Sequence, residues 1–302
     1  MSSSLHFKPI TDKDMQLILP FLALEKGRSC DFSYGGLLMW VDYFDYQYCI
    51  DDDTLFIKGM APSGNGETAF AMPLGYRNLE SAFEMLRDYC IANDMKLEFS
   101  AIPEEDKEKL MRFNPKEVIS INRWNDYIYD AESLATLKGK KMSKKRNHVN
   151  QFTTSYPDWR YERLRPEHIP QIESYTSKAI AAEAQQTEEA IFERKLAAKY
   201  LREVSGGNPN IIGGVLSVGD KIIAYTIGDV KGDTLFVHIE KGERSYSGCF
   251  ETINKCFAQD IVNSYPEVKY INREDDADDP GLRLAKQSYH PVEILKKYNI
   301  KF

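Results

Sequence analysis

The chain has 302 residues, of which 42% are hydrophobic and 28% charged, and a formal net charge of −7. This composition is typical of a soluble globular protein and excludes a disordered or fibrous chain, while the length allows two domains. No apolar run approaches the roughly 18 residues of a membrane helix, and the first residues lack a secretory signal. Five cysteines without a C-x-x-C pair favour reduced thiols, so we expect a cytoplasmic protein.

The first half begins with a predicted strand at 5–10 and a helix that starts with a capping-box pattern. The aromatic-rich segment CDFSYGGLLMWVDYFDYQY follows at 30–48, and most of its rings are expected in the core. Its two glycines would let a ligand approach the backbone closely, which makes Tyr34 and Trp40 candidates for lining a pocket. A strand meander, a helix at 78–94 and a strand at 95–102 complete this half.

The middle of the chain is basic, although the protein as a whole is acidic. Residues 133–157 contain no acid, and residues 138–146 include six lysines and arginines. We expect a helix here with Met142, Val149 and Phe152 buried, and with cations on another face. Such a helix suits a phosphate-rich donor, either a nucleotide cofactor or tRNA bound through residues 138–148. The alternative is a solvated linker helix.

The second half repeats the order of the first. Apolar runs at 211–218, 221–230 and 234–241 are joined by residues typical of hairpin turns. A helix at 248–265 and a strand at 268–272 follow, so each half reads strand, helix, meander, helix, strand, helix. This is the order of the acetyltransferase-type (GNAT) fold. We therefore predict an α+β protein with tandem GNAT-like domains at 1–130 and 158–302, each a mixed, mostly antiparallel sheet flanked by helices, joined by the basic segment 131–157.

The segment HIEKGERSYSG at 238–248 lies where the acetyltransferase fold holds the cofactor pyrophosphate. The customary loop has the form [QR]-x-x-G-x-[GA], but Arg244 and Gly248 are one residue too far apart. Glu240 and Glu243 would also repel phosphate. The sequence therefore argues against ordinary use of acetyl-CoA.

The segment YINREDDADDPGLRLAKQSYHP at 270–291 is rich in aspartate. Asp279-Pro280 is a typical helix start, which favours helix capping over metal binding for the acidic run, and we predict no metal site. Asn272, Arg273 and Glu274 stand at the end of a predicted strand, where clefts open in mixed sheets. Arg273 could hold a carboxylate or phosphate, with Glu274 as a base; the alternative is an internal ion pair.

Taken together, CDFSYGGLLMW, GKKMSKKRNHVNQF, HIEKGERSYSGCFETINKCFA and the segment 270–291 resemble a soluble bacterial family. This family is related to the C-terminal synthase domain of phosphatidylglycerol lysyltransferases. The resemblance spans nearly the whole chain and implies two tandem acetyltransferase-type domains, as in the peptidoglycan-bridge aminoacyltransferases. Those relatives move an aminoacyl group from charged tRNA to a lipid hydroxyl or a peptide amine. A tRNA donor would account for a poor CoA loop beside a basic segment.

We hypothesise an acyl- or aminoacyltransferase whose donor is aminoacyl-tRNA and whose acceptor is an amine or hydroxyl. Glu240 or Glu274 would deprotonate the acceptor, Arg273 would position a carbonyl or carboxylate, and Tyr289 would protonate the leaving oxygen. The predicted substrate-binding residues are Lys144, Lys145, Arg146, Asn147, Tyr34, Trp40, Asn272 and Lys286. The alternatives are an acetyl-CoA-dependent N-acetyltransferase and a duplicated, non-catalytic ligand-binding protein.

Overall fold

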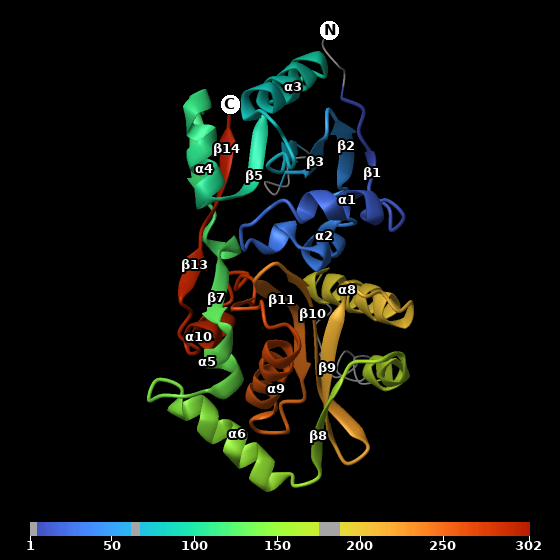
Figure 1. Ribbon diagram of the computed structural model, residues 1–302, viewed down its shortest axis with the longest axis vertical. Coiled ribbons are helices and arrows are strands. Elements are labelled where there is room, and N and C mark those ends of the chain that lie inside the picture. Colours follow the sequence, from blue (N-terminus) through green and yellow to red (C-terminus); the bar gives the residue numbers. More distant parts are fainter. Residues whose placement is uncertain (1–4, 62–66, 175–187) are drawn as a thin grey trace. The chain divides into compact units, whose positions relative to one another are not determined.

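The computed structural model describes residues 5–61, 67–174 and 188–302, with the side chains of 188–194 left out. In this part of the chain the strands form two sheets of seven strands each (Figure 1). Both sheets are mixed, mostly antiparallel and accompanied by helices, which confirms the predicted α+β class.

The first sheet has the strand order β1-β2-β3-β4-β5-β14-β6. Its strands are β1 (Lys8–Pro9), β2 (Gln47–Asp51), β3 (Thr54–Met60), β4 (Thr68–Phe70), β5 (Glu98–Pro103), β6 (Glu117–Ser120) and β14 (Lys297–Lys301). The helices of this half are α1 (Met15–Leu22), α2 (Tyr34–Trp40), α3 (Leu79–Ala92) and α4 (Glu104–Leu110).

The second sheet has the strand order β13-β7-β12-β11-β10-β9-β8. Its strands are β7 (Asp126–Asp130), β8 (Trp159–Arg163), β9 (Ile212–Val218), β10 (Lys221–Lys231), β11 (Thr234–Gly242), β12 (Tyr270–Asn272) and β13 (Glu293–Leu295). The helices are α5 (Ala131–Thr136), α6 (Ser143–Ser155), α8 (Glu188–Ser205), α9 (Cys249–Ser264) and α10 (Pro280–Gln287).

A parallel pair stands in the same place in the order of elements of each sheet. β4 pairs in parallel with β5, and β11 with β12. Parallel neighbours need a crossover connection, and the two connections contain α3 and α9 respectively. Because both halves contain this crossover, the order of helices and strands is the same in the two halves of the sequence.

The chain forms two compact units that are discontinuous in sequence. The first comprises Met1–Asp126, Asp275–Pro280 and Ile294–Phe302, and the second comprises Tyr127–Glu274 and Gly281–Glu293. The last strand, β14, lies between β5 and β6 of the first sheet, although it ends the chain. The domain intervals proposed from the sequence, 1–130 and 158–302, are continuous and do not assign the last strand to the first unit.

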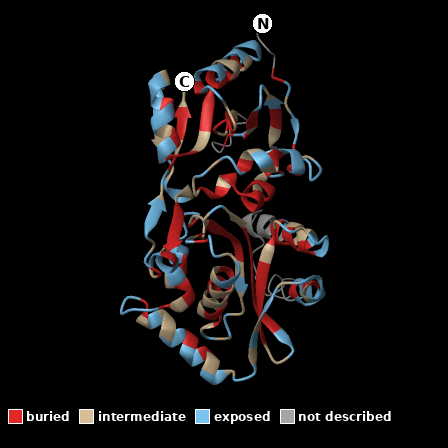
Figure 2. Cartoon of the chain, in the orientation of Figure 1, coloured by how far each residue is buried: buried red, intermediate tan, exposed pale blue. Residues whose placement is uncertain are grey.

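Burial follows the apolar runs of the second half. β10 is buried from Ile222 to Asp229, and β11 is buried from Thr234 to Ile239 (Figure 2). In the described part of this unit, one buried cluster is built around Tyr129, Phe257 and Ile261, and another around Phe152 and Ile253. Because β10 and β11 are apolar on both faces, any polar group within them needs a partner.

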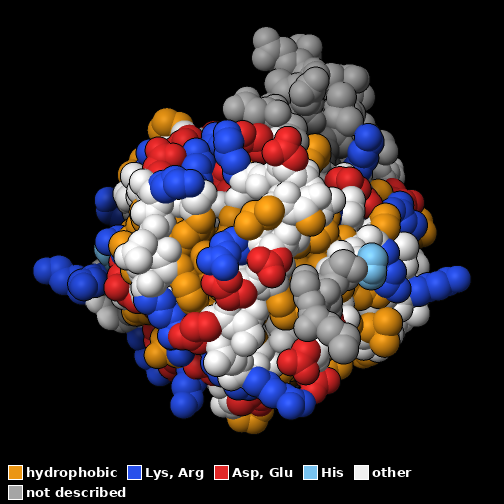
Figure 3. All heavy atoms as spheres, turned by 90° about the horizontal axis from the view of Figure 1, so that it is seen from above, with side chains coloured by type: hydrophobic (Ala, Val, Ile, Leu, Met, Phe, Trp, Pro, Cys, Tyr) orange, Lys and Arg blue, Asp and Glu red, His pale blue; other side chains and the backbone are white. Residues whose placement is uncertain are grey.

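Charged side chains of both signs are mixed with hydrophobic ones on the face shown in Figure 3. Among the described residues, no helix is long and apolar enough to cross a membrane. The acidic run before α10 bonds to its own backbone, since Asp275 accepts the N–H of Ala277 at 2.8 Å and Asp276 that of Asp278 at 3.0 Å. These bonds stabilise the turn that leads into the helix.

Candidate functional site

A β-bulge in β11 separates two polar side chains that a regular strand would place together. The register of β11 against β10 skips His238, which is therefore the extra residue of a bulge. In a regular strand, residues i and i+2 share one face. Here His238 stacks on Tyr200 of α8, with ring centroids 5.6 Å apart, whereas Glu240 bonds to Asn254 of α9. The bulge thus directs His238 toward α8 and Glu240 toward α9.

His238 forms a buried ionic triad with two carboxylates. Its Nδ1 lies 2.6 Å from Oε1 of Glu274, and its Nε2 is bonded to Oδ1 of Asp229. Since both partners are carboxylates, both ring nitrogens act as donors and the ring is an imidazolium. Burial alone would lower the pKa of His238, but its hydrogen bonds to the two carboxylates, together with the charges of these groups, raise it to about 10.

The backbone around Glu274 is fixed by a local turn. Glu274 has φ +57°, in the left-handed region that a glutamate seldom adopts. Its N–H donates to Oδ1 of the fully buried Asn272 at 2.6 Å, and an asparagine turn of this kind stabilises such a conformation. The turn directs the Glu274 carboxylate to His238 and leaves its side chain 18% exposed. Asn272 therefore positions Glu274.

Arg273 is the centre of a second cluster, which we call the arginine cluster. Its members are Arg273, Glu240, Asn254, Tyr289 and Lys145. Arg273 Nη2 donates to Oε1 of Glu240 at 2.9 Å, and each of the two side chains is 12% exposed. The guanidinium carbon lies 4.9 Å from the ring centroid of Tyr289, within cation–π range. Burial would lower the pKa of Arg273, but the charge of Glu240 keeps it above its ordinary value.

Two buried polar atoms of this cluster lack a hydrogen-bond partner among the described residues. They are Nη1 of Arg273, a donor, and Oδ1 of Asn254, an acceptor. Asn254 is only 3% exposed, and its Nδ2 donates to Oε2 of Glu240 at 3.1 Å. A carboxylate only accepts, so the amide nitrogen faces Glu240 and the amide oxygen is the unpaired group. Unpaired polar atoms in a protein interior are rare, and each calls for an explanation.

Lys145 joins the basic helix α6 to the arginine cluster. Its Nζ lies 4.1 Å from the ring centroid of Tyr289 and 3.3 Å from Oε1 of Glu251 in α9. The sequence predicted an exposed cation here, but the Lys145 side chain is 15% exposed because it packs between these partners. Burial raises the pKa of Tyr289, so its hydroxyl stays protonated at neutral pH. A phenol with a raised pKa is a weaker acid, so it can protonate only a strongly basic oxygen such as an alkoxide.

Of the other predicted residues of α6, Arg146 anchors the loop before the helix, and Lys144 and Asn147 are exposed. Arg146 Nη1 donates to the carbonyl oxygens of Leu137 at 2.5 Å and Gly139 at 3.2 Å, which holds the loop before the helix. The predicted buried stripe of Met142, Val149 and Phe152 is confirmed, with exposed fractions of 4%, 6% and 0%.

The remaining predicted residues lie in two different units. Lys286 is buried and donates from Nζ to the carbonyl oxygen of Arg273 at 2.5 Å, so it supports the backbone of the arginine cluster. Tyr34 and Trp40 belong to α2 of the first unit. Tyr34 is 8% exposed, and Trp40 packs edge to face on Tyr43 with centroids 5.7 Å apart.

Helix α6 packs against the turn that an acetyltransferase would use for its cofactor. A Cβ placed on Gly248, just before α9, would lie 2.5 Å from the carbonyl oxygen of His148 in α6. Gly248 has φ +84°, and it permits this close approach because it has no side chain. The first turn of α9 therefore faces another helix of the same unit.

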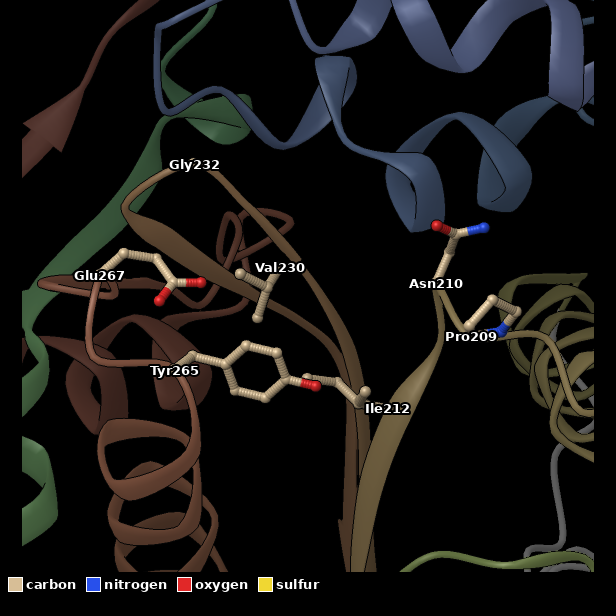
Figure 4. Close-up of a pocket in the computed structure, with 7 residues that line it drawn as sticks. All are labelled: Pro209, Asn210, Ile212, Val230, Gly232, Tyr265 and Glu267. Carbon is tan, nitrogen blue, oxygen red and sulfur yellow. The ribbon is translucent and has the colours of Figure 1, made fainter.

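A surface cavity of about 360 Å³ lies elsewhere in the second unit. It is lined by Pro209, Asn210, Ile212, Val230, Gly232, Tyr265 and Glu267 (Figure 4). Gly232 belongs to the turn between β10 and β11, whereas Glu240 lies near the other end of β11. This cavity is thus formed by residues other than those of the arginine cluster.

A family model described as phosphatidylglycerol lysyltransferase, C-terminal, matches residues 23–301. The chain belongs to this family. It is also 25% identical over 181 residues to an uncharacterised protein of Mycoplasmoides gallisepticum. That match covers 58% of this chain and 56% of the relative, so the chain spans little more than half of the curated protein.

Solved structures support the same fold. A conserved protein of unknown function from Bacteroides thetaiotaomicron is 33% identical, with a TM-score of 0.88 and 99% of each chain covered. The L-PGS structure from Bacillus licheniformis has 13% identity and a TM-score of 0.67, covering 97% of this chain and 92% of that one. FemX has 7% identity, a TM-score of 0.64 and coverage of 99% and 98%. The fold is that of tandem acetyltransferase-type domains, as predicted.

His238, Asp229 and Asn254 were not among the residues predicted from the sequence. A signal for the first two existed: a histidine and an aspartate stand within apolar runs of adjacent strands, and the hairpin pairs Phe236 with Asp229. Buried charges of this kind need partners. Asn254 gave no signal, because one asparagine in an amphipathic helix is ordinary.

Proposed function

We propose that the protein is an aminoacyltransferase that moves an aminoacyl group from charged tRNA to an amine or hydroxyl acceptor. Family membership supports a transferase of this general type. The observation that carries the proposal is the position of Lys145, which extends from the basic helix to the ring of Tyr289. Cations suited to RNA phosphates and groups suited to acyl transfer therefore belong to one continuous arrangement.

In this proposal Glu274 is the base. Both carboxylate oxygens of Glu240 are occupied, one by Arg273 and one by Asn254, whereas the interaction of Glu274 with His238 uses Oε1. Glu240 then holds Arg273 in place instead of taking the proton. Arg273 would direct a donor N–H at the ester carbonyl, where negative charge develops during transfer.

The reaction balances as a simple acyl transfer. The acceptor N–H or O–H gives its proton to Glu274 while the acceptor atom bonds to the ester carbonyl carbon. The bond from that carbon to the ribose oxygen then breaks, and the ribose oxygen takes a proton from Tyr289. Proton exchange through solvent returns Glu274 and Tyr289 to their starting states. Nothing is oxidised or reduced.

Donor phosphates would contact the exposed side of the basic segment. Lys144 is exposed on α6, and Lys140 and Lys141 precede the helix in an exposed stretch. The place of α6 against the turn before α9 also speaks against acetyl-CoA, since backbone N–H groups at that turn would have to receive the pyrophosphate. This agrees with the departure of residues 244–248 from the customary loop.

The test uses bulk tRNA charged with labelled amino acids, at two salt concentrations, with acetyl-CoA as competitor. We expect binding that weakens as salt rises and is unaffected by acetyl-CoA. Transfer is then measured with small amines, peptides and phosphatidylglycerol vesicles as acceptors, against spontaneous deacylation. Saturable acetyl-CoA binding without tRNA binding would instead support an N-acetyltransferase. Binding of neither would support a non-catalytic protein.

A further inference from the structure

The two unpaired atoms of the arginine cluster form a complementary pair. Nη1 of Arg273 offers a hydrogen to an acceptor, and Oδ1 of Asn254 accepts a hydrogen from a donor. Both residues bond to the same carboxylate, Glu240, one through each oxygen. The two side chains therefore flank one negatively charged carboxylate, and with it they form a small polar site.

We infer that this site binds the free α-amino group and the carbonyl group of the aminoacyl donor. The carbonyl oxygen would accept from Nη1 of Arg273. The α-amino group would donate to Oδ1 of Asn254 and be attracted by the Glu240 carboxylate. The inference rests on the proposed function, and it adds that the enzyme recognises the part of the donor common to all amino acids and rejects donors with a blocked α-amino group.

The surroundings make this a preorganised site. Tyr289 stacks on the guanidinium of Arg273, and Lys286 holds the Arg273 carbonyl oxygen, so the arginine has little freedom to turn. Asn254 is fixed by its bond to Glu240 within the buried face of α9. Arg273 and Glu240 are each 12% exposed, so the cluster reaches the protein surface beside the two buried atoms. Groups held ready in this way bind without first being ordered.

The charges around the site cancel, and its hydrogen-bond acceptors are what favour an amine. Glu240 and Glu251 carry two negative charges, and Arg273 and Lys145 carry two positive charges. An α-amino group of an aminoacyl ester can bind neutral or protonated, because Asn254 and Glu240 are both acceptors toward it. An N-acetyl group would remove the positive charge and add bulk beside a side chain that is 3% exposed.

The test measures binding of L-amino acid amides and their N-acetyl derivatives to the full-length protein, by calorimetry or ligand-observed NMR, without tRNA. We expect at least one free amide to bind and its N-acetyl form to bind at least tenfold more weakly. Asn254→Leu keeps the volume and removes the amide oxygen, so it should weaken the free amide about tenfold. Asn263→Leu, an exposed site on the same helix, is the control and should change nothing.

Arg273→Lys gives a second route if Asn254→Leu does not fold. It keeps the charge but lacks the forked donors, and it should weaken every amide that binds the native protein. Equal binding of free and N-acetyl amides, or no amide binding by correctly folded protein, would overturn the inference and indicate that water alone fills the site. Amide discrimination without any tRNA transfer would refute the proposed function only, and transfer without discrimination would refute the inference only.

Discussion

Each compact unit contains a buried ion cluster, and the two clusters differ in how completely they are paired. In the first unit, Lys297 Nζ lies 2.6 Å from Asp31, 2.9 Å from Asp126 and 3.3 Å from the sulfur of Cys30. The Lys297 and Asp126 side chains are 2% and 0% exposed. In the second unit, the arginine cluster is partly exposed and keeps a donor and an acceptor unpaired.

This difference separates a structural cluster from a functional one. The Lys297 cluster joins the last strand, β14, to residues of the N-terminal half, and Asp126 also accepts the N–H of Cys30 at 2.9 Å. Each of its charged groups has a partner within the fold, so it stabilises one arrangement of the chain. The arginine cluster has the unused hydrogen-bonding capacity that a ligand needs. Substitutions in the two clusters should therefore affect different measurements.

The largest effect is expected for Glu274→Gln in the transfer assay. Loss of a general base should lower the transfer rate by about 10²–10⁴-fold, while amide and tRNA binding stay near wild type. The matched change Glu162→Gln alters an exposed carboxylate of the same unit, outside the arginine cluster and the His238 triad, and should retain most activity. A Glu274→Gln protein that transfers at the wild-type rate would assign the base to another residue.

Lys297→Met should act on stability instead. It leaves Asp31 and Asp126 without their buried cation, which should lower the free energy of unfolding by about 3–5 kcal/mol. Lys301→Met, on the same strand, breaks an exposed pair with Glu117 and should cost less than about 1 kcal/mol. Urea unfolding of both variants measures the difference. Equal losses of unfolding free energy in the two variants would show that the Lys297 cluster does not hold β14 in place.

The His238 triad predicts a loss of stability at alkaline pH. The folded pKa of about 10 lies above the ordinary 6.5, so the folded protein keeps a proton that the unfolded chain releases. This stabilisation is complete below pH 6.5 and is lost as the pH rises toward 10, by at most about 1.4 kcal/mol per pH unit. Urea midpoints between pH 6 and 10 measure it. In His238→Gln the slope should largely disappear, and an unchanged slope would assign it to other groups.

The smallest effect is expected at the exposed side of α6. Lys144→Glu should weaken charged-tRNA binding several-fold at low salt and reduce its salt dependence, because a phosphate contact is lost. Lys195→Glu places the same charge change on the exposed side of α8 and should have a smaller effect. Equal effects of the two changes would mean that net charge, and not the basic segment, governs binding.

Much of the fold followed from local patterns in the sequence. The hairpin turns at Gly219-Asp220 and Gly232-Asp233, the buried stripe of α6 and the repeated order of elements were predictable, because turn chemistry and helical periodicity act over a few residues. The repeat also indicated the tandem architecture. The sequence further singled out Arg273, Glu274, Glu240 and Tyr289 as polar groups at strand and helix ends.

Only the tertiary structure decided how these groups are paired. The stacking of His238 on Tyr200, its bond to Glu274 and the contact of Lys145 with Tyr289 join residues that are tens to more than a hundred positions apart. The same is true of β14, whose place between β5 and β6 depends on pairing across nearly 200 residues. Local sequence sets what each segment can form. Which polar atoms find partners, and which are left for a ligand, depends on packing between distant segments.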